Sequence, residues 1–63
     1  MFRLVIEDKN IDYELDNANE VANAIFNNTN EWMFASHVRQ VCKEAKSGDR
    51  FEYEDDGIII EYL

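Results

Sequence analysis

Carboxylates are the residues of this 63-residue sequence with the clearest chemistry, because 14 of them against 6 lysines and arginines give a formal net charge of −8. Two groups are regularly spaced: Asp12, Glu14 and Asp16 form the first, and Glu52, Glu54, Asp55 and Asp56 form the second. Carboxylates in fixed rows attract a basic protein surface and repel nucleic acid and anionic membranes. We therefore expect a protein partner with a basic groove, and neither direct nucleic-acid binding nor membrane binding.

The spacing of these carboxylates is compatible with imitation of a nucleic-acid backbone. Residues on one face of a strand lie about 6.8 Å apart, and phosphates on one DNA strand advance about 3.4 Å per nucleotide. A predicted pairing of Glu52 with Glu61 favours this interpretation, because directly opposed like charges destabilise a sheet and suggest another use. The alternative interpretation is an ordinary solvated sheet face in an acidic protein.

Catalytic and metal-binding residues are few, with one histidine, one cysteine and two serines. His37 and Cys42 are five positions apart, or about 140° around a helix, so they do not face each other as a base and a nucleophile. A single histidine disfavours a zinc site, and residues 49–56 lack the D-x-D-x-D-G spacing of a calcium loop. The sequence therefore predicts no enzyme, no metal and no cofactor, with Cys42 as a buried small hydrophobic residue.

Length and composition predict one domain, residues 1–63, near the lower size limit for a chain that folds on a single hydrophobic core. The hydrophobic fraction of 46% is typical of a folded domain. A lone cysteine argues against secretion, and the apolar run at residues 1–6 is shorter than the core of a signal peptide. No segment reaches membrane-spanning length, so we expect a cytoplasmic protein.

Alternating apolar and polar residues predict four strands, at residues 2–7, 11–15, 50–55 and 58–62. Residues 8–10 have turn composition, and Asp56-Gly57 is typical of a two-residue type I′ turn. The pairs expected from two-residue loops are Ile6–Ile11, Leu4–Tyr13 and Phe2–Leu15 in the first hairpin, and Tyr53–Ile60 and Glu52–Glu61 in the second. A four-residue loop keeps the same residues on the core face, so the register of the first hairpin stays open.

Helical spacing predicts two helices between the hairpins. Asp16 or Asn17 caps the first, whose apolar positions are Ala18, Val21, Ala22, Ile25 and Phe26. The second spans about residues 31–47 and ends at Gly48. Its expected core stripe is Phe34, Val38, Val41 and Ala45, flanked by Ala35 and Cys42.

The element order predicts an α+β fold (ββααββ), a four-stranded antiparallel sheet with two helices packed on one face. The aliphatic strands 2–7 and 58–62 are expected at its centre. The acidic strands 11–15 and 50–55 are expected at its edges, where charged side chains discourage unwanted pairing.

A second candidate surface lies on the second helix, opposite its core stripe. It contains Trp32, Ser36, Arg39 and Lys43. An exposed tryptophan beside an arginine is a common interface anchor, whereas the alternative is that Trp32 folds back onto the core. A ladder of amides on the first helix, formed by Asn19, Asn23 and Asn27, is either a further contact surface or exposed filler.

In length, charge and its two carboxylate rows, Asp12-x-Glu14-x-Asp16 and Glu52-x-Glu54-Asp55-Asp56, the sequence resembles the small inhibitors encoded by phages and mobile elements. Anti-CRISPR and anti-restriction proteins are the best-known examples. The resemblance implies a non-enzymatic inhibitor that occupies the basic groove of a CRISPR effector or restriction enzyme in the host cytoplasm. It is a resemblance of class and transfers no residue role.

From the charge pattern we expect the partner to contact Asp12, Glu14, Asp16, Glu52, Glu54, Asp55 and Asp56. Trp32 would add affinity that does not depend on charge. The alternative hypothesis is a small regulatory or assembly module that forms a homodimer through an edge strand or the Trp32 face.

Overall fold

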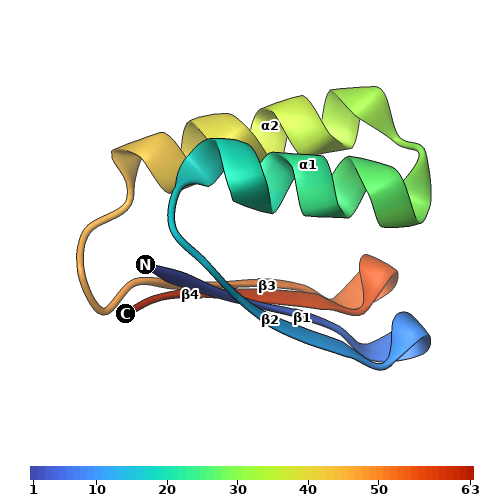
Figure 1. Cartoon of the computed structure of the whole chain (residues 1–63), viewed down its shortest axis with the longest axis horizontal. Helices are drawn as coiled ribbons and strands as arrows, with labels where there is room; N and C mark the ends of the chain where they lie inside the picture. The colour runs from blue at the N-terminus through green and yellow to red at the C-terminus, as the bar shows by residue number, and fades with distance from the viewer.

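Two β-hairpins flank a pair of helices in the computed structural model, which describes residues 1–63 (Figure 1). The elements are β1 (Phe2–Ile6), β2 (Ile11–Leu15), α1 (Ala18–Thr29), α2 (Trp32–Glu44), β3 (Arg50–Tyr53) and β4 (Ile58–Tyr62). Two short 3₁₀ turns, η1 (Glu7–Lys9) and η2 (Glu54–Asp56), lie within the hairpin loops. The predicted order ββααββ is confirmed.

The four strands form one antiparallel sheet in the order β2-β1-β4-β3. Both helices lie on the same face of this sheet (Figure 1). The aliphatic strands β1 and β4 are therefore central and the acidic strands β2 and β3 are edges, as predicted. Since β1 and β4 are antiparallel neighbours, the two hairpin turns lie at one end of the sheet, opposite both chain ends (Figure 1).

In the first hairpin, whose register the sequence left open, Ile6 lies opposite Ile11, as in one of the arrangements considered. The second differs from the prediction by two residues, because Tyr53 pairs with Ile58 and not with Ile60. Its loop contains four residues and ends at Gly57, whose φ of 65° lies in the left-handed region that glycine favours. The loop of the first hairpin has the same form and ends at Asn10, with φ of 55°.

The core lies between the sheet and the helices and consists of twelve buried hydrophobic residues. They are Phe2, Leu4, Ile6, Ala18, Val21, Ala22, Ile25, Ala35, Val38, Cys42, Ile58 and Ile60. The strand residues among them alternate along β1 and β4, so one face of the sheet is buried and the other is free of helices. No polar or charged residue is buried.

Helix α1 begins as predicted at Asn17, whose side-chain oxygen accepts a hydrogen bond from the Glu20 backbone N–H at 2.9 Å. The Asn17 amide also donates to the Glu20 carboxylate at 3.2 Å, so the two residues form a reciprocal cap. The helix ends at Asn30, which adopts φ of 59°. Phe26, an expected core residue, is 38% exposed instead.

Helix α2 is shorter than predicted, because the chain becomes extended at Ala45. The Lys46 backbone N–H donates to the Asp49 carboxylate at 2.8 Å, which forms a loop where a further helical turn was expected. Gly48 therefore lies in this loop and does not end the helix. Neither helix combines the length and apolar character that crossing a membrane requires.

The buried stripe of α2 is rotated from the expected one. Ala35, Val38 and Cys42 are buried, whereas Phe34, Val41 and Ala45 are only partly buried. The burial of Cys42 is as predicted.

Candidate binding surfaces

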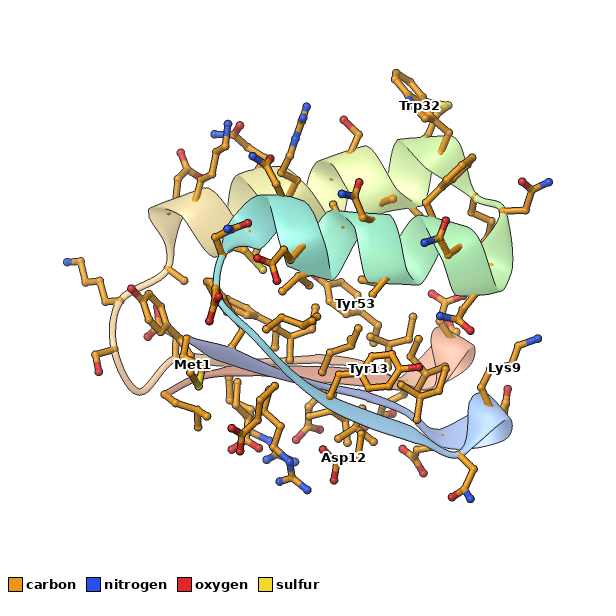
Figure 2. All side chains as sticks on the ribbon, in the orientation of Figure 1. Met1, Lys9, Asp12, Tyr13, Trp32 and Tyr53 are labelled. Carbon is orange, nitrogen blue, oxygen red and sulfur yellow. The ribbon has the colours of Figure 1, made fainter.

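The sheet face that the helices leave open carries an ion-pair network. Arg3 on β1 donates two hydrogen bonds to the Asp12 carboxylate on β2, from Nη2 at 2.8 Å and from Nε at 3.0 Å. Its Nη1 atom lies 3.2 Å from Glu61 Oε1 on β4. Figure 2 shows Asp12 on the side of the sheet away from the helices.

Arg50 extends this network to the opposite edge of the sheet. Its Nε atom donates to Glu52 Oε1 at 2.8 Å, and its Nη1 atom lies 3.3 Å from Glu61 Oε2. Two arginines thus link three carboxylates across all four strands. Each pair is exposed and contributes little stability alone, but the network leaves Asp12 and Glu52 partly neutralised.

The hairpin register explains this network. Arg50 lies directly opposite Glu61, and Glu52 lies opposite Ile59. The predicted pairing of Glu52 with Glu61 is therefore wrong, and the like-charge contact that favoured the backbone-imitation hypothesis does not occur. The open face therefore combines paired opposite charges with the apolar neighbours Val5 and Ile59, and it is not a bare row of carboxylates.

The carboxylates of the predicted contact set that form no ion pair lie at the margins of the sheet. Glu14 is on the edge strand β2 and Asp16 follows it, and both are exposed. The others of the predicted set, Glu54, Asp55 and Asp56, form the turn η2, also exposed. All five are thus available to a partner, unlike Asp12 and Glu52.

The turn η1 lies directly beside η2. The Glu7 backbone N–H donates to the Gly57 carbonyl at 2.8 Å, and a Cβ atom added to Gly57 would lie 3.8 Å from the Asp8 carboxylate. Glu7 and Asp8 therefore join the η2 carboxylates in one cluster, with Lys9 as its only cation. The sequence indicates this cluster only indirectly, through the two aliphatic strands expected at the centre of the sheet. When these two strands pair in antiparallel fashion, as β1 and β4 do, both hairpin loops lie at the same end of the sheet.

The net charge is carried entirely by one layer of the molecule. Residues 17–46, which form the helical layer, contain three carboxylates and three cations, namely Glu20, Glu31, Glu44, Arg39, Lys43 and Lys46. The hairpin segments, 1–16 and 47–63, contain the other eleven carboxylates and three cations and hence the whole charge of −8. The molecule is therefore acidic on its sheet side and neutral on its helical side.

The outer surface of the helical layer contains a groove of about 580 Å³ between α1 and α2. It is lined by Asn19, Ala22, Asn23, Phe26, Trp32, Ala35, Ser36 and Arg39. Trp32 is 68% exposed and points away from the sheet (Figure 2), so the alternative in which it folds back onto the core is wrong. Two of the predicted amides share the groove with the tryptophan face of α2, whereas Lys43 and Asn27 do not line it.

Cys42 and His37, the two residues considered for nucleophilic chemistry, differ in their exposure to solvent. Cys42 is buried, and this burial raises the pKa of its thiol to about 11. His37 is exposed and its ring lies at a steep angle to that of Tyr53, with the centroids 6.4 Å apart. No group of three or more histidine, cysteine, aspartate or glutamate side chains is arranged to hold a metal ion.

Replacement of Arg3 by glutamine is expected to raise the pKa of the Asp12 carboxyl toward its usual value of 3.8. Hydrogen bonds from the Arg3 guanidinium hold that pKa lower in the folded chain. The pair therefore stabilises the fold above about pH 4 and loses this effect as the pH falls through the folded-state pKa of Asp12. An NMR titration of the carboxyl carbon measures the change.

Arg50→Gln is the matched control for this titration, because Arg50 contacts Glu52 and Glu61 but not Asp12. It should leave the Asp12 pKa unchanged. An Asp12 pKa that is the same in wild type and Arg3→Gln would show that the ion pair does not persist in solution.

Comparison with known proteins gives no match to this chain, whether among protein-family models, curated proteins or solved structures. Its charge distribution and its two exposed surfaces are thus the basis for a functional hypothesis.

Proposed function

We propose that this chain is a non-enzymatic inhibitor that binds the basic groove of a nucleic-acid-binding protein, in the manner of anti-CRISPR and anti-restriction proteins. The observation that carries the proposal is the charge asymmetry between layers, because residues 17–46 are neutral and the hairpin segments hold the whole net charge of −8. A field concentrated on one side orients the molecule toward a basic surface and speeds association.

The contact surface in this proposal is the acidic end of the sheet together with the β2 margin. It comprises Glu7, Asp8, Glu14, Asp16, Glu54, Asp55 and Asp56, none of which forms an ion pair within the chain. Each 3₁₀ turn is closed by a backbone hydrogen bond, and the two turns are joined by the bond from Glu7 to Gly57. The backbone that carries these carboxylates is therefore ordered before binding, which lowers the entropic cost of association.

Asp12 and Glu52 have a different role in this proposal from the one expected from sequence. Their carboxylates are already engaged by Arg3 and Arg50, so a basic partner would have to compete with an existing ion pair. We expect them to hold the two arginines in place and to contribute less to binding than the turn carboxylates.

Neutralising the η2 turn is expected to weaken binding strongly, since it removes three adjacent charges from the contact surface. The test variant is Glu54→Gln/Asp55→Asn/Asp56→Asn, and the matched control is Glu20→Gln/Glu31→Gln/Glu44→Gln. Both change the net charge from −8 to −5, but they do so on opposite layers. The comparison therefore separates the position of the charge from its amount.

Wild type and both variants would serve as bait in parallel pull-downs from host-cell lysate, followed by affinity measurement on the captured protein. We expect wild type and the helical control to retain a nuclease or other nucleic-acid-binding protein with affinities within about fivefold, and the turn variant to lose about 100-fold or more. Wild-type affinity should also fall as salt concentration rises. Equal capture by the turn variant and wild type would reject the proposal, provided that circular dichroism shows both to be folded.

A further inference from the structure

The groove on the helical layer has opposite character at its two ends. Helices α1 and α2 are antiparallel (Figure 1), so Phe26 and Trp32 lie near one end and Asn19 and Arg39 near the other. Ala22 and Ala35 line the groove between them and are both buried. Their small side chains leave room for another structural element to approach closely.

Several groups around this groove have no partner within the chain. Arg39 forms no ion pair and no side-chain hydrogen bond, and neither do the amides of Asn19 and Asn23. Trp32 leaves about 170 Å² accessible, because it is 68% exposed and a tryptophan can bury roughly 250 Å². Phe26 at the same end of the groove is 38% exposed, so the two rings give this end of the groove an exposed apolar surface of the kind found at interaction sites.

We propose that the groove is occupied by a second copy of this chain, related by a two-fold axis that passes between Ala35 and Ser36. Trp32 and Arg39 are seven residues apart, close to two full turns, and both line the same groove. Antiparallel packing of α2 on its copy about that axis brings Trp32 of each protomer against Arg39 of the other. Small residues at the axis allow the two helices to approach closely.

The pattern of residues on α2 favours a second copy over an unrelated partner. A two-fold interface requires a self-complementary surface, in which residue i contacts residue j and residue j contacts i. An aromatic ring at one end and an unpaired guanidinium at the other meet this requirement, since an arginine stacks favourably on the face of a tryptophan. The exposed amides along α1 can form hydrogen bonds at the rim of the same interface.

The charge distribution is compatible with this dimer despite the net charge of −8 on each chain. The helical layers that meet are neutral, so they neither repel each other nor attract a strongly charged partner. The acidic sheets lie on opposite outer sides and about 30 Å apart, if each of the three interlayer spacings is about 10 Å. That distance exceeds the Debye length of about 8 Å at physiological ionic strength, so repulsion between the sheets is screened.

Sedimentation equilibrium and tryptophan fluorescence from about 1 µM to about 1 mM protein test the proposal. Trp32 is the only tryptophan, so its emission should shift to the blue over the same concentrations at which the dimer forms. Trp32→Ala and Arg39→Ala should each weaken the dimer by about 30-fold or more, because tryptophan and arginine are the residue types that most often dominate binding energy at interfaces. Met33→Ala is the control, because Met33 is more exposed than Trp32 but does not line the groove, and it should change the dissociation constant less than about threefold.

An exchange variant tests the two-fold geometry itself. Trp32→Arg/Arg39→Trp places each side chain at the position of the other, and the proposed axis then restores the same contact. The double variant should dimerise within about tenfold of wild type and more tightly than either single exchange.

Three results would overturn the proposal. The first is a wild-type chain that stays monomeric up to about 1 mM. This result would overturn the proposal even if the Trp32 emission shifted when another protein was added. The second is a dimer that Trp32→Ala and Arg39→Ala leave intact. The third is an exchange variant no tighter than its single exchanges, which would exclude the antiparallel arrangement.

Discussion

Replacing Ile60 by alanine is expected to remove half or more of the free energy of unfolding. Ile60 lies at the centre of the sheet, between Leu4 on β1 and Phe51 on β3, and its exposed fraction is 0%. Such a truncation of a buried aliphatic residue costs about 2–5 kcal/mol. A chain of this length has roughly 3–9 kcal/mol in total, at about 0.05–0.15 kcal/mol per residue, so the variant should unfold at a much lower urea concentration than wild type.

Ile59→Ala is the matched control, because it is the same change one position earlier on the same strand. Ile59 lies on the open face between Val5 and Glu52 and is only partly buried. Its truncation should cost about 1 kcal/mol or less, mainly through strand propensity. Urea unfolding followed by circular dichroism, at one fixed protein concentration, measures both; equal transition midpoints would mean that the two faces of β4 are equally buried in solution.

The side chains of each strand that face the core were predictable, because successive side chains along a strand alternate between the two faces of the sheet. A first loop with any even number of residues keeps Leu4 and Ile6 on the same face as Ile11. A second loop with any even number of residues keeps Ile58 and Ile60 on the same face as Tyr53, so uncertainty about the turns did not affect the predicted core. Which strands lie at the centre was predictable for a different reason. The most aliphatic strands need neighbours on both sides, and only β1 and β4 meet this description.

The second hairpin register was not predictable from its turn residues. Gly57 supplies a positive φ in a two-residue type I′ turn and equally at the last position of a four-residue loop. The two loops differ by two residues in register, and this difference decides which side chain lies opposite Glu61. In the observed register that residue is Arg50 and not Glu52, so one turn converts an expected like-charge contact into an ion-pair network.

The rotation of α2 has its cause in the helix beside it. Apolar residues at 34, 35, 38, 41, 42 and 45 define a wide stripe, and the sequence does not show which part of it faces the sheet. Ala35 is buried and lines the interhelical groove with Ala22 of α1, which turns the bulkier Phe34 toward the rim of the core. There its ring packs edge-on against Tyr53, with the centroids 5.2 Å apart.

The Cys42 thiol is expected to react with iodoacetamide at pH 8 about 100-fold more slowly in the native chain than in the unfolded chain. Burial raises its pKa from 9.0 to about 11, and the thiolate is the reactive form. Two pKa units lower the thiolate fraction about 100-fold at this pH, and the surrounding core further restricts access. Mass spectrometry of the alkylated chain, with and without urea, measures both rates.

The same pKa difference makes the fold sensitive to alkaline pH. Between pH 9 and about 11 the unfolded chain has released the thiol proton while the folded chain retains it, so the unfolded state gains an advantage. The contribution of the neutral thiol is therefore fully present below pH 9 and is lost as the pH rises toward 11. Burial also raises the pKa of the Tyr53 hydroxyl, which acts in the same direction.

Cys42→Ala separates these two contributions, since it removes the thiol and leaves Tyr53 in place. We expect this variant to be less stable than wild type at neutral pH, because it leaves a small cavity, but to lose less stability between pH 9 and 11. Equal losses in the two proteins would assign the alkaline sensitivity to Tyr53. A native thiol that reacts as fast as the unfolded one would show that the core around Cys42 opens readily, and both helices would then have to be regarded as loosely packed on the sheet.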